Sequence, residues 1–541
     1  MLILQKIKPF LTMPTDCISY QNSGYFSALI NDYLDQKPNL KPLYNRFPTL
    51  ENFKAQIIEK EGNFNPTHRK ELVAVLQNQY SGTTTSDKTK QNIESLIHSN
   101  TFTITTGHQL NLLTGPLYFL YKIISTINLT KELKAAYPKY NFVPIYWMAT
   151  EDHDFEEINY FIFKGKKFRW NTESKGPVGR LSTKGLEEVF DVFSKEIGTS
   201  NNANAIKKLF KEAYLNHANL ADATRFLANE LFGDHGLVIL DADTPDLKRQ
   251  FIPFIKDELW NQSSNKLVLE TIKKLKEYTV QVTPREINLF YINNTLRERI
   301  ILENGVYKVN NTKIQFSKAE ITTELEKHPE RFSPNVILRP LYQEVILPNL
   351  CYIGGGGEIA YWLELKSMFT NAKITFPILL LRNSALLITE KQTKKADRLN
   401  LTWENLFSKQ EELVNLKTKQ FSEFPIDLSI QKEILKKQFE YLKTLAHQTD
   451  TSFIGAVKAQ ETKQIKGLDN LEKRLLKAQK RKYTDELERI IDLQNQLFPQ
   501  KSLQERQANF SEFYLENGNL LFSKLINELK PLENKLSTLK I

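Results

Sequence analysis

The sequence predicts an α/β protein with a doubly wound parallel sheet at its core, insertions between the strands, and a helical C-terminal domain with a coiled coil. A strand, a loop, a long amphipathic helix and a second apolar strand succeed one another over residues 102–149, which is the βαβ pattern of a parallel sheet. Two more strand-length apolar runs follow at residues 236–243 and 373–384. Beyond about residue 390 glycine becomes rare and leucines recur three and four positions apart, which is typical of long helices.

The first elements can be placed in order along the chain. The first hundred residues have the apolar spacing of helices separated by turns, and the β-branched run Phe102–Thr105 is the first strand of the βαβ unit. "TGHQ" is predicted as a turn, and a helix is expected over Leu117–Leu133, ended by Pro138. The buried strand "NFVPIYWMA" follows it. This order places both strands side by side and parallel.

Long stretches of other material separate the later strands. We interpret residues of about 163–235 and 281–330 as insertions into one core that spans residues 1–389, because loop-closure cost grows slowly with length. Residues 390–541 are predicted to form a helical region, with an antiparallel coiled coil over about 425–498. Its apolar seams comprise Leu435, Phe439, Leu442 and Ala446 on one helix, and Leu468, Leu471, Leu475 and Ala478 on the other. Each seam could face the other, the core or a second subunit.

Composition narrows the class of protein. The hydrophobic fraction of 41% and the charged fraction of 25% are those of a soluble globular protein. No run approaches a membrane span and the N-terminus lacks the pattern of a signal peptide, so a cytoplasmic protein without membrane contact is expected. Cys17 and Cys351 are too few for a disulfide framework and are expected to be structural.

The stretch "TTGHQLNLLTGPLYFLYK" is the first candidate for chemistry. It follows a strand, so His108 and Gln109 are expected at the carboxyl edge of the sheet, where open α/β sheets bind ligands. Gly115 would allow a bound group to approach the backbone, and Thr114 would cap the following helix, with Pro116 at its first position. A helix start favours an anion. A plain strand-to-helix loop with one exposed histidine is the alternative.

The stretch "TEDHDFEEIN" comes directly after the second strand and is expected at the same edge. Glu151, Asp152, His153 and Asp154 could ligate a divalent ion, or bind an amine and transfer protons. A structural alternative makes Thr150, Asp152 or Asp154 the cap of a helix whose first turn contains Glu156 and Glu157. The cap does not account for a histidine between two aspartates, so we assign the first four residues to a ligand site.

Two further motifs contain candidate ligand contacts. Four glycines in "NLCYIGGGGEIAYWLELK" are costly in conformational entropy unless backbone N–H groups must surround a ligand. This assigns Gly354, Gly355 and Gly356 to cofactor binding, and Glu358, Tyr361 and Trp362 on the next helix to substrate binding. Arg339 and Arg382 lie in or after apolar runs, where an arginine needs a carboxylate or phosphate partner. Either could instead pair with the acids at 151–154.

Four ordered stretches carry a resemblance over nearly the whole chain: "TGHQLNLLTGPLYFLYK", "WMATEDHDFEEIN", "GGGGEIAYWLELK" and "FPILLLRNS". With a coiled-coil C-terminus, they resemble the BshC family, the cysteine-adding enzymes of bacillithiol biosynthesis. The resemblance implies a Rossmann-like core akin to class I aminoacyl-tRNA synthetases, and a homodimer formed through the coiled coil. It also implies a ligase that joins the carboxyl group of L-cysteine to the amine of glucosaminyl-malate, the last step of the pathway.

In this likeness His108 and Gln109 stand where a synthetase has its phosphate-binding histidine motif, although no lysine loop of the synthetase type lies near Arg382. Amide formation needs an activated carboxyl group, so ATP or another nucleotide is expected, with Mg²⁺ optional and no firm metal site. The turn at 108–115 would hold phosphate, Arg382 or Arg339 would counter developing charge, and Glu151–Asp154 would bind an ammonium group. One of those acids or His153 would deprotonate the attacking amine.

Two alternatives belong to other classes of protein. A metal-dependent hydrolase could use the acids at 151–154 with His153. An RNA-associated protein could use the basic coiled coil as an arm, but acids are mixed with its lysines and argue against a continuous basic stripe, so a nucleic-acid partner is not expected. These acids are Glu472, Asp485, Glu486 and Glu488.

Overall fold

The computed structural model describes residues 17–541, so the first 16 residues of the predicted core lie outside the described part. The core contains a five-stranded sheet in the order β13-β12-β2-β3-β6. Every neighbouring pair in it is parallel, which confirms the doubly wound fold class. The strands are β2 (Thr101–His108), β3 (Asn141–Met148), β6 (Val238–Asp241), β12 (Asn349–Gly354) and β13 (Ile378–Leu381).

The predicted βαβ unit forms the centre of this sheet. Helix α6 (Tyr118–Ala136) links β2 to β3 and packs against both. The strands pair in register from Thr101 with Asn141 to His108 with Met148. The prediction of a turn at "TGHQ" is wrong in part, because Gly107 and His108 still belong to β2. With a hydrogen-bonded neighbour on each side, β2 continues to the edge of the sheet and carries His108 with it.

Two elements near the glycine run differ from expectation. Strand β12 was not predicted, although it lies between β2 and β13, because "NLCYIG" is short and ends in glycine, which is depleted in strands. The run 373–384 was expected to be one strand. Instead the chain leaves the core sheet after Leu381, and β14 (Ser384–Ile388) joins β1 (Cys17–Ser19) and β15 (Lys535–Lys540) in a second sheet.

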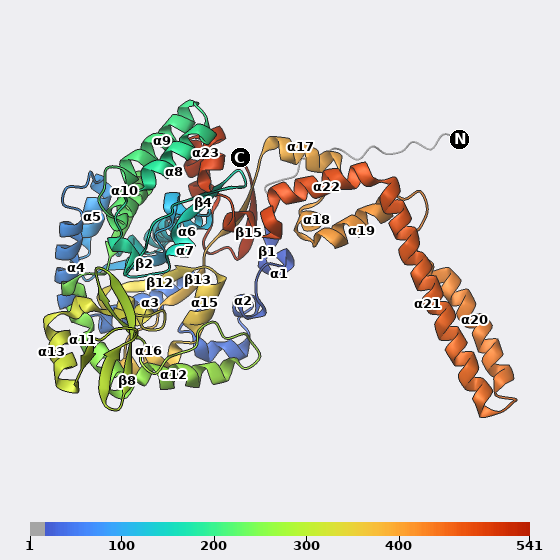
Figure 1. The fold of residues 1–541 in the computed structure, drawn as a ribbon, viewed down its shortest axis with the longest axis horizontal. Coiled ribbons are helices and arrows are strands. Elements are labelled where there is room, and N and C mark those ends of the chain that lie inside the picture. The colour runs from blue at the N-terminus through green and yellow to red at the C-terminus, as the bar shows by residue number, and fades with distance from the viewer. Residues whose placement is uncertain (1–16) are drawn as a thin grey trace.

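Both predicted insertions lie on the outside of the core (Figure 1). The first contains the hairpin β4 (Tyr160–Phe163) and β5 (Lys166–Arg169). Helices α8 (Leu186–Ile197), α9 (Asn201–Tyr214) and α10 (Leu220–Phe232) follow it. After β6 come α11 (Pro245–Asn261) and α12 (Ser263–Ile272), and then an antiparallel sheet in the order β10-β9-β8-β7-β11. Its strands are β7 (Leu289–Asn293), β8 (Leu296–Glu303), β9 (Val306–Val309), β10 (Gln315–Phe316) and β11 (Phe332–Pro334).

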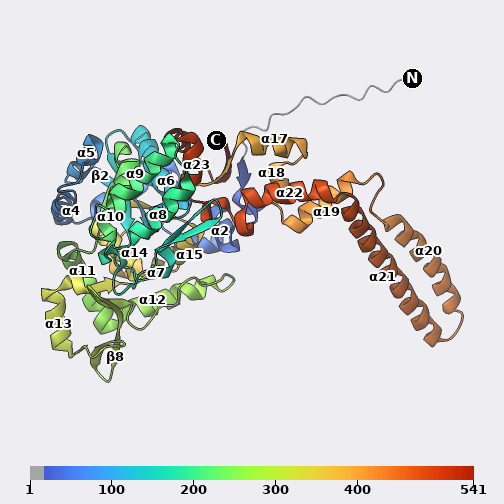
Figure 2. The ribbon, with the colours of Figure 1, turned by 45° about the horizontal axis from the view of Figure 1, so that its top comes forward.

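Part of the C-terminal domain extends from the core as an arm (Figures 1 and 2). This arm consists of an antiparallel pair of helices, α20 (Ser429–Ala446) and α21 (Thr451–Lys482). It is shorter than the predicted 425–498, because the chain kinks at Tyr483 and α22 (Thr484–Leu497) returns to pack on α19 (Gln410–Phe421). In the seam Phe439 is buried, whereas Leu442 and Leu471 remain 40% and 54% exposed. The two helices therefore cover only part of each other's apolar surface.

The end of the chain returns from the arm to the core. After α22, a short 3-10 turn (Gln504–Arg506) lies against β14. Helices α23 (Phe510–Asn517) and α24 (Leu520–Glu528) pack on α9 and α6, and β15 completes the sheet with β1 and β14. Among residues 17–541, no helix is long and apolar enough to cross a membrane.

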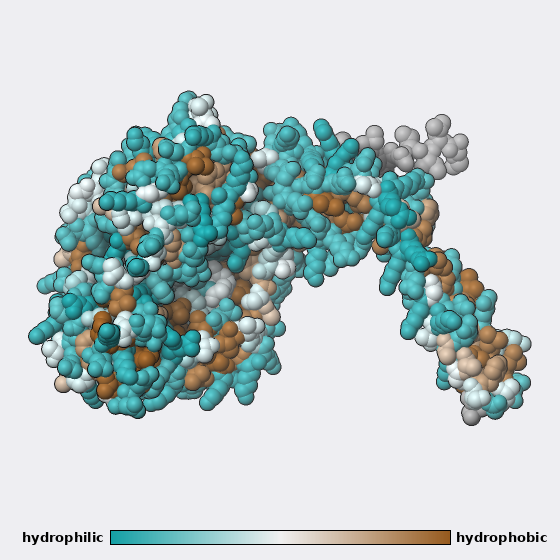
Figure 3. All heavy atoms as spheres, in the orientation of Figure 1, coloured by the Kyte–Doolittle hydropathy of each residue, from teal (hydrophilic) through white to brown (hydrophobic). Residues whose placement is uncertain are grey.

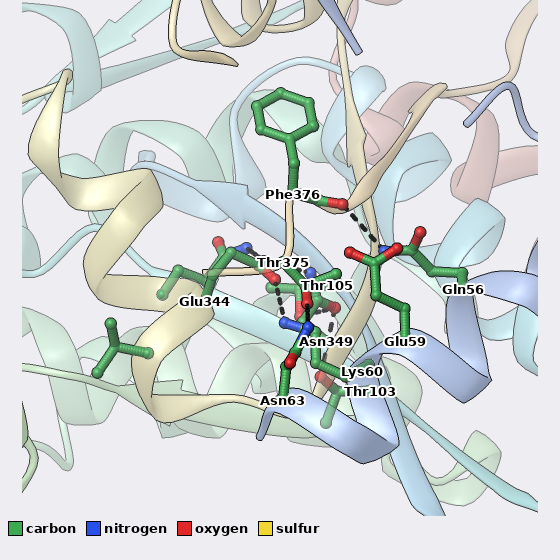
Figure 4. A network of polar contacts seen from close by, with 12 residues as sticks. Gln56, Glu59, Lys60, Asn63, Thr103, Thr105, Glu344, Asn349, Thr375 and Phe376 are labelled. Atoms are coloured by element: carbon green, nitrogen blue, oxygen red, sulfur yellow. Dashed lines mark hydrogen bonds and ion pairs between the residues drawn. The ribbon is translucent and has the colours of Figure 1, made fainter. Parts of the chain in front are cut away.

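A buried polar network connects β2 and β12 to two helices (Figure 4). Lys60 of α3 (Leu50–Asn63) pairs with Glu344 of α14 (Leu338–Ile346) at 3.0 Å, and both side chains are buried. Asn349 donates to Glu344 over 2.6 Å and accepts from the Thr105 hydroxyl over 2.9 Å. Burial raises the pKa of Glu344, while the charge of Lys60 opposes that rise. The ion pair and the amide thus fix β12 beside β2.

Replacing Lys60 with Met should lower the free energy of unfolding by about 3–5 kcal/mol, because Glu344 would stay buried without a cation. Urea unfolding followed by tryptophan fluorescence would measure the loss. Arg46→Met is the matched control. Arg46 pairs with Glu59, which like Lys60 lies on α3, but the Arg46 and Glu59 side chains are 24% and 30% exposed. The loss in free energy of unfolding should therefore stay below about 1 kcal/mol. Equal losses in the two variants would contradict this role for the buried pair.

Candidate active site

A cavity of about 860 Å³ opens at the carboxyl ends of β2, β3 and β12. Its floor comes from the ends of these strands and from α6 and α15 (Gly356–Leu363), and the insertion sheet and the loop before β7 form its opposite wall. The surface is hollowed between the core and the insertion sheet (Figure 3). This volume lies in the upper part of the range for ligand sites, so it can hold more than one small molecule.

Ten of the residues predicted to form the site line this cavity together. They are His108, Gln109, Glu151, Asp152, Arg339, Gly355, Gly356, Glu358, Tyr361 and Arg382. Six others are absent from the lining: Thr114, Gly115, His153, Asp154, Gly354 and Trp362. The sheet edge thus gathers side chains that lie more than 250 positions apart along the sequence.

The predicted cap at Thr114 is wrong. Helix α6 begins at Tyr118, and its N-cap Leu117 makes no side-chain capping bond. Leu113 and Thr114 both have positive φ angles, of 46° and 66°, so the chain turns away from the cavity before the helix starts. A β-carbon on Gly115 would lie 2.7 Å from the Asn111 β-carbon, which shows that Gly115 is needed for packing here, not for approach to a ligand.

The placement of two residues near the glycine run also differs from expectation. Trp362 is fully buried and stacks on Tyr352, with ring centroids 4.5 Å apart. It therefore supports the cavity wall from behind and does not touch a ligand there. A β-carbon on Gly354, the last residue of β12, would lie 2.9 Å from the Glu358 β-carbon, so this glycine permits the tight strand-to-helix turn.

The acidic stretch divides into a half inside the cavity and a half outside it. Asp152 accepts from the Gln109 amide over 3.0 Å and from the backbone N–H of His153 over 2.8 Å. Burial alone would raise the pKa of Asp152, but the His153 side chain beside it, these hydrogen bonds and the charge of Arg297 hold it below its ordinary value. Asp152 is therefore an ionised carboxylate in the cavity wall.

Glu151 lies beside Asp152 in a different environment. It forms an ion pair with Lys248, whose side chain is fully buried. Burial raises the pKa of Glu151 although Lys248 opposes the rise. Two neighbouring carboxyl groups thus have pKa values shifted in opposite directions, which is the arrangement that separates a charge-binding group from a proton acceptor.

His153 and Asp154 are exposed outside the cavity. The His153 Nδ1 lies 2.6 Å from the Arg297 guanidinium, and Asp154 stands at the N-cap of the short helix α7 (Phe155–Ile158) without a capping bond from its side chain. Glu157 in the first turn of α7 accepts from Gln109 over 2.8 Å. Within residues 17–541, no group of three or more His, Cys, Asp or Glu side chains is arranged to hold a metal ion.

Lys122 of α6 extends to the cavity floor and was not predicted. Its ammonium group donates to the Gly107 carbonyl over 2.7 Å and pairs with Glu358 at 2.5 Å. Glu358 also accepts from the Tyr352 hydroxyl and from the Gly355 N–H. Burial alone would raise the pKa of Glu358, but Lys122 and these donors hold it low, so the buried pair is ionised. A single lysine in the apolar run "YFLYKIIS" is the signal that could have revealed it.

Two arginines and a histidine meet at the floor. Arg339 lies over the rings of Trp147 and Tyr352, 5.6 and 5.5 Å from their centroids. Burial, with the charges of Lys122 and Arg382, lowers the pKa of His108 far below its ordinary value, so its imidazole is neutral. In the described part of the chain, three buried nitrogens of this floor have no hydrogen-bond partner: His108 Nε2, Arg339 Nη2 and Arg382 Nε.

The insertion sheet and the C-terminal domain add further cations to the lining, and sequence reasoning missed them. Arg297 and Arg299 are two positions apart on β8 and so face the same side. Arg297 lies over the Phe290 ring at 4.0 Å. Together the cavity has seven cationic side chains against three acids: Lys122, Arg285, Arg297, Arg299, Arg339, Arg382 and Arg506 against Glu151, Asp152 and Glu358. Such a cavity attracts anions and places a cationic group at its acidic corner.

Two family profiles together match nearly the whole chain. The profile described as "Bacillithiol biosynthesis BshC, N-terminal Rossmann-like domain" matches residues 13–383. The corresponding C-terminal coiled-coil domain matches residues 385–541.

Three similar proteins are each named "Putative cysteine ligase BshC". The protein from Flavobacterium johnsoniae is 70% identical over 98% of this chain and 100% of its own length. That from Flavobacterium psychrophilum is 67% identical with the same coverage, and that from Bacillus cytotoxicus is 29% identical over 93% and 95% of the two chains. The chain therefore belongs to the BshC family of bacillithiol biosynthesis.

Proposed function

We propose that this protein is a cysteine ligase that joins the carboxyl group of L-cysteine to the amine of glucosaminyl-malate. The observation that carries the proposal is the cavity at the carboxyl edge of the sheet, in a chain similar over its whole length to proteins named as cysteine ligases. That cavity combines an excess of cations with the ionised carboxylate of Asp152. Both substrates contain a carboxylate and an ammonium group, so the two signs of charge in the cavity match them.

Asp152 and Glu151 would divide the handling of the attacking amine. A carboxylate with a lowered pKa is a poor base but a good partner for an ammonium group, so Asp152 would bind and orient the amine of glucosaminyl-malate. Glu151, whose pKa burial raises, is the stronger base and would take the proton as the amine attacks. The nitrogen then bonds to the cysteine carbonyl carbon, and the activating group leaves with the oxygen that carried it. His153 lies outside the cavity and would act only indirectly, by helping to hold Asp152 ionised.

The floor would bind the anionic part of the activating cosubstrate, ATP or another nucleotide. The three unpartnered nitrogens of His108, Arg339 and Arg382 fit phosphate oxygens, which pair well with guanidinium groups. Gly355, the N-cap of α15, leaves this end of the helix open to the cavity. Lys122 would add positive charge where negative charge develops in the transition state.

The malyl end of glucosaminyl-malate contains two carboxylates and needs cations of its own. Arg285, Arg299 and Arg506 line the cavity, and within residues 17–541 none of them forms an ion pair with an acid. We assign them to this end.

Neither alternative function gains support. A metal-dependent hydrolase would need the acids at 151–154 to gather around one point, and in the described residues they do not. An RNA-binding arm would need free lysines, but Lys432 on the arm pairs with Asp469 and Glu472.

The arm would form a homodimer. Its helices expose Ile430, Ile434, Tyr441, Phe453 and Leu471, and apolar surface is visible along the arm (Figure 3). A groove between α20 and α21 is lined in part by Ile434, Leu435, Leu468 and Leu471. Exposed apolar surface of this kind marks a site of protein association.

Asp152→Asn should lower kcat/KM for glucosaminyl-malate by about 10- to 100-fold, because an amide offers the ammonium group no charge. Asp154→Asn is the matched control, since Asp154 is exposed and lies outside the cavity; its kcat/KM should not change. The measurement is bacillithiol formation by the purified protein, followed by mass spectrometry. An Asp152→Asn enzyme with full activity would refute the role of this carboxylate.

ATP with Mg²⁺ should bind the purified protein in isothermal titration, and Arg339→Met should weaken that binding by about tenfold or more through loss of a charge-assisted contact. Thr114→Ala should bind as the unmodified protein does, because Thr114 lies outside the cavity. Absence of binding even with both substrates present would exclude the ATP-dependent form of the proposal.

Leu471→Lys should convert a dimer into a monomer, because the ammonium group would be placed in the apolar groove of the arm. Multi-angle light scattering after gel filtration would report the mass. Leu520→Lys provides the control, since Leu520 is 74% exposed on α24, away from the arm. A mass of one chain for the unmodified protein would contradict the proposed dimer.

A further inference from the structure

The 3-10 turn Gln504–Arg506 brings three consecutive side chains from the C-terminal domain to the edge of the cavity. The Gln504 amide accepts from the Leu387 N–H over 2.9 Å and donates to the Leu387 carbonyl over 3.0 Å, which docks the turn on β14. Arg506 lines the cavity. Glu505 lies between them and is almost completely buried. Docking on β14 does not require a charged side chain at this position, because the neutral amide of Gln504 already docks the turn.

Glu505 holds Arg382. Its Oε1 accepts from Arg382 Nη2 over 2.7 Å and from the Ser384 hydroxyl over 2.8 Å, and its Oε2 accepts from the Ala385 N–H over 3.2 Å. Both charged side chains of the pair are at most 5% exposed. A buried ion pair adds little stability over a neutral pair of the same shape. Its charge therefore suggests a role in the cavity.

The remaining contacts of Arg382 show what the pair achieves. Arg382 Nη1 donates to the Asn383 carbonyl over 2.9 Å, and the guanidinium lies 5.2 Å from the centre of the Tyr118 ring. These contacts and Glu505 fix the far end of the group, while Nε has no partner among the described residues. Nε lies 3.7 Å from the position that a β-carbon on Gly355 would take. The free N–H is thus presented beside the start of α15, at the cavity floor.

We propose that Glu505 is a positioning residue that orients Arg382 for an anion, so that the C-terminal domain completes the anion-binding floor of a cavity built mainly by the Rossmann-like core. This rests on the proposed function only in assigning an anionic ligand to that floor. Glu505 touches no ligand itself; it acts through Arg382. A fixed guanidinium binds an oxyanion better than a mobile one, because less side-chain entropy is lost on binding.

Electrostatics alone predicts the opposite effect of removing Glu505. Loss of a nearby negative charge would make the floor more positive and would tighten the binding of an anion. Positioning predicts weaker binding, since Arg382 would lose the contact that fixes it. The sign of the change therefore separates the two roles.

The test measures the affinity of the full chain for inorganic pyrophosphate by isothermal titration. Glu505→Gln should weaken binding by about tenfold. Gln494→Leu is the control for general loosening of the C-terminal domain: Gln494 is buried and donates to the Leu406 and Ser408 carbonyls, away from the cavity, so its affinity should stay within about twofold. Arg382→Met should also weaken binding, and Glu505→Gln should add no further loss in that background.

Three results would overturn the proposal: no pyrophosphate binding by the unmodified chain, unchanged or tighter binding by Glu505→Gln, or an equal further loss from Glu505→Gln in the Arg382→Met background. If Arg382→Met does not fold, Arg382→Lys takes its place in the cycle. A chain that shows the expected binding cycle but forms no bacillithiol would refute the proposed function and leave the positioning role of Glu505 supported.

Discussion

The common direction of five strands is the constraint on which the candidate site depends. Because β2, β3, β6, β12 and β13 are all parallel, their carboxyl ends meet at one edge. His108, Asp152, Gly355 and Arg382 lie at or just beyond the carboxyl ends of four different strands and come together only there. The Lys60–Glu344 pair and Asn349 hold the start of β12 beside β2, which supports this arrangement of the strands. Long insertions can then build the opposite wall without disturbing it.

Charge is organised by depth within the cavity. The groups of the floor are buried and mostly held by protein partners: Lys122 by Glu358, Arg382 by Glu505, Glu151 by Lys248. What remains for a ligand is a small set of nitrogens with no partner in the described structure and the ionised carboxylate of Asp152. Arg285 and Arg506, which also line the cavity, are exposed. This division gives the anion and the amine separate places, as an amide-forming reaction requires.

The sequence was most informative where local pattern decides structure. The βαβ unit, the two insertions and the helical pair of the arm all follow from apolar spacing. Strand β12 was not predicted because its glycine-rich end lacks strand character. Its place in the sheet is decided by pairing with β2 and β13. Arg299 and Arg506 were not predicted because nothing near them in sequence indicates a shared cavity; only long-range packing brings them together. Trp362 shows the converse: it follows Tyr361, which lines the cavity, but its own side chain is buried in the core.

A crystal structure of the protein with glucosaminyl-malate bound would test most directly whether the sheet edge is the site of ligation. We expect the molecule inside the cavity, with its ammonium group within hydrogen-bond distance of Asp152 and its malyl carboxylates against Arg285, Arg299 or Arg506. Density for the molecule elsewhere, for example in the groove between α20 and α21, with the cavity free of it, would contradict the assignment of the sheet edge as the site of ligation.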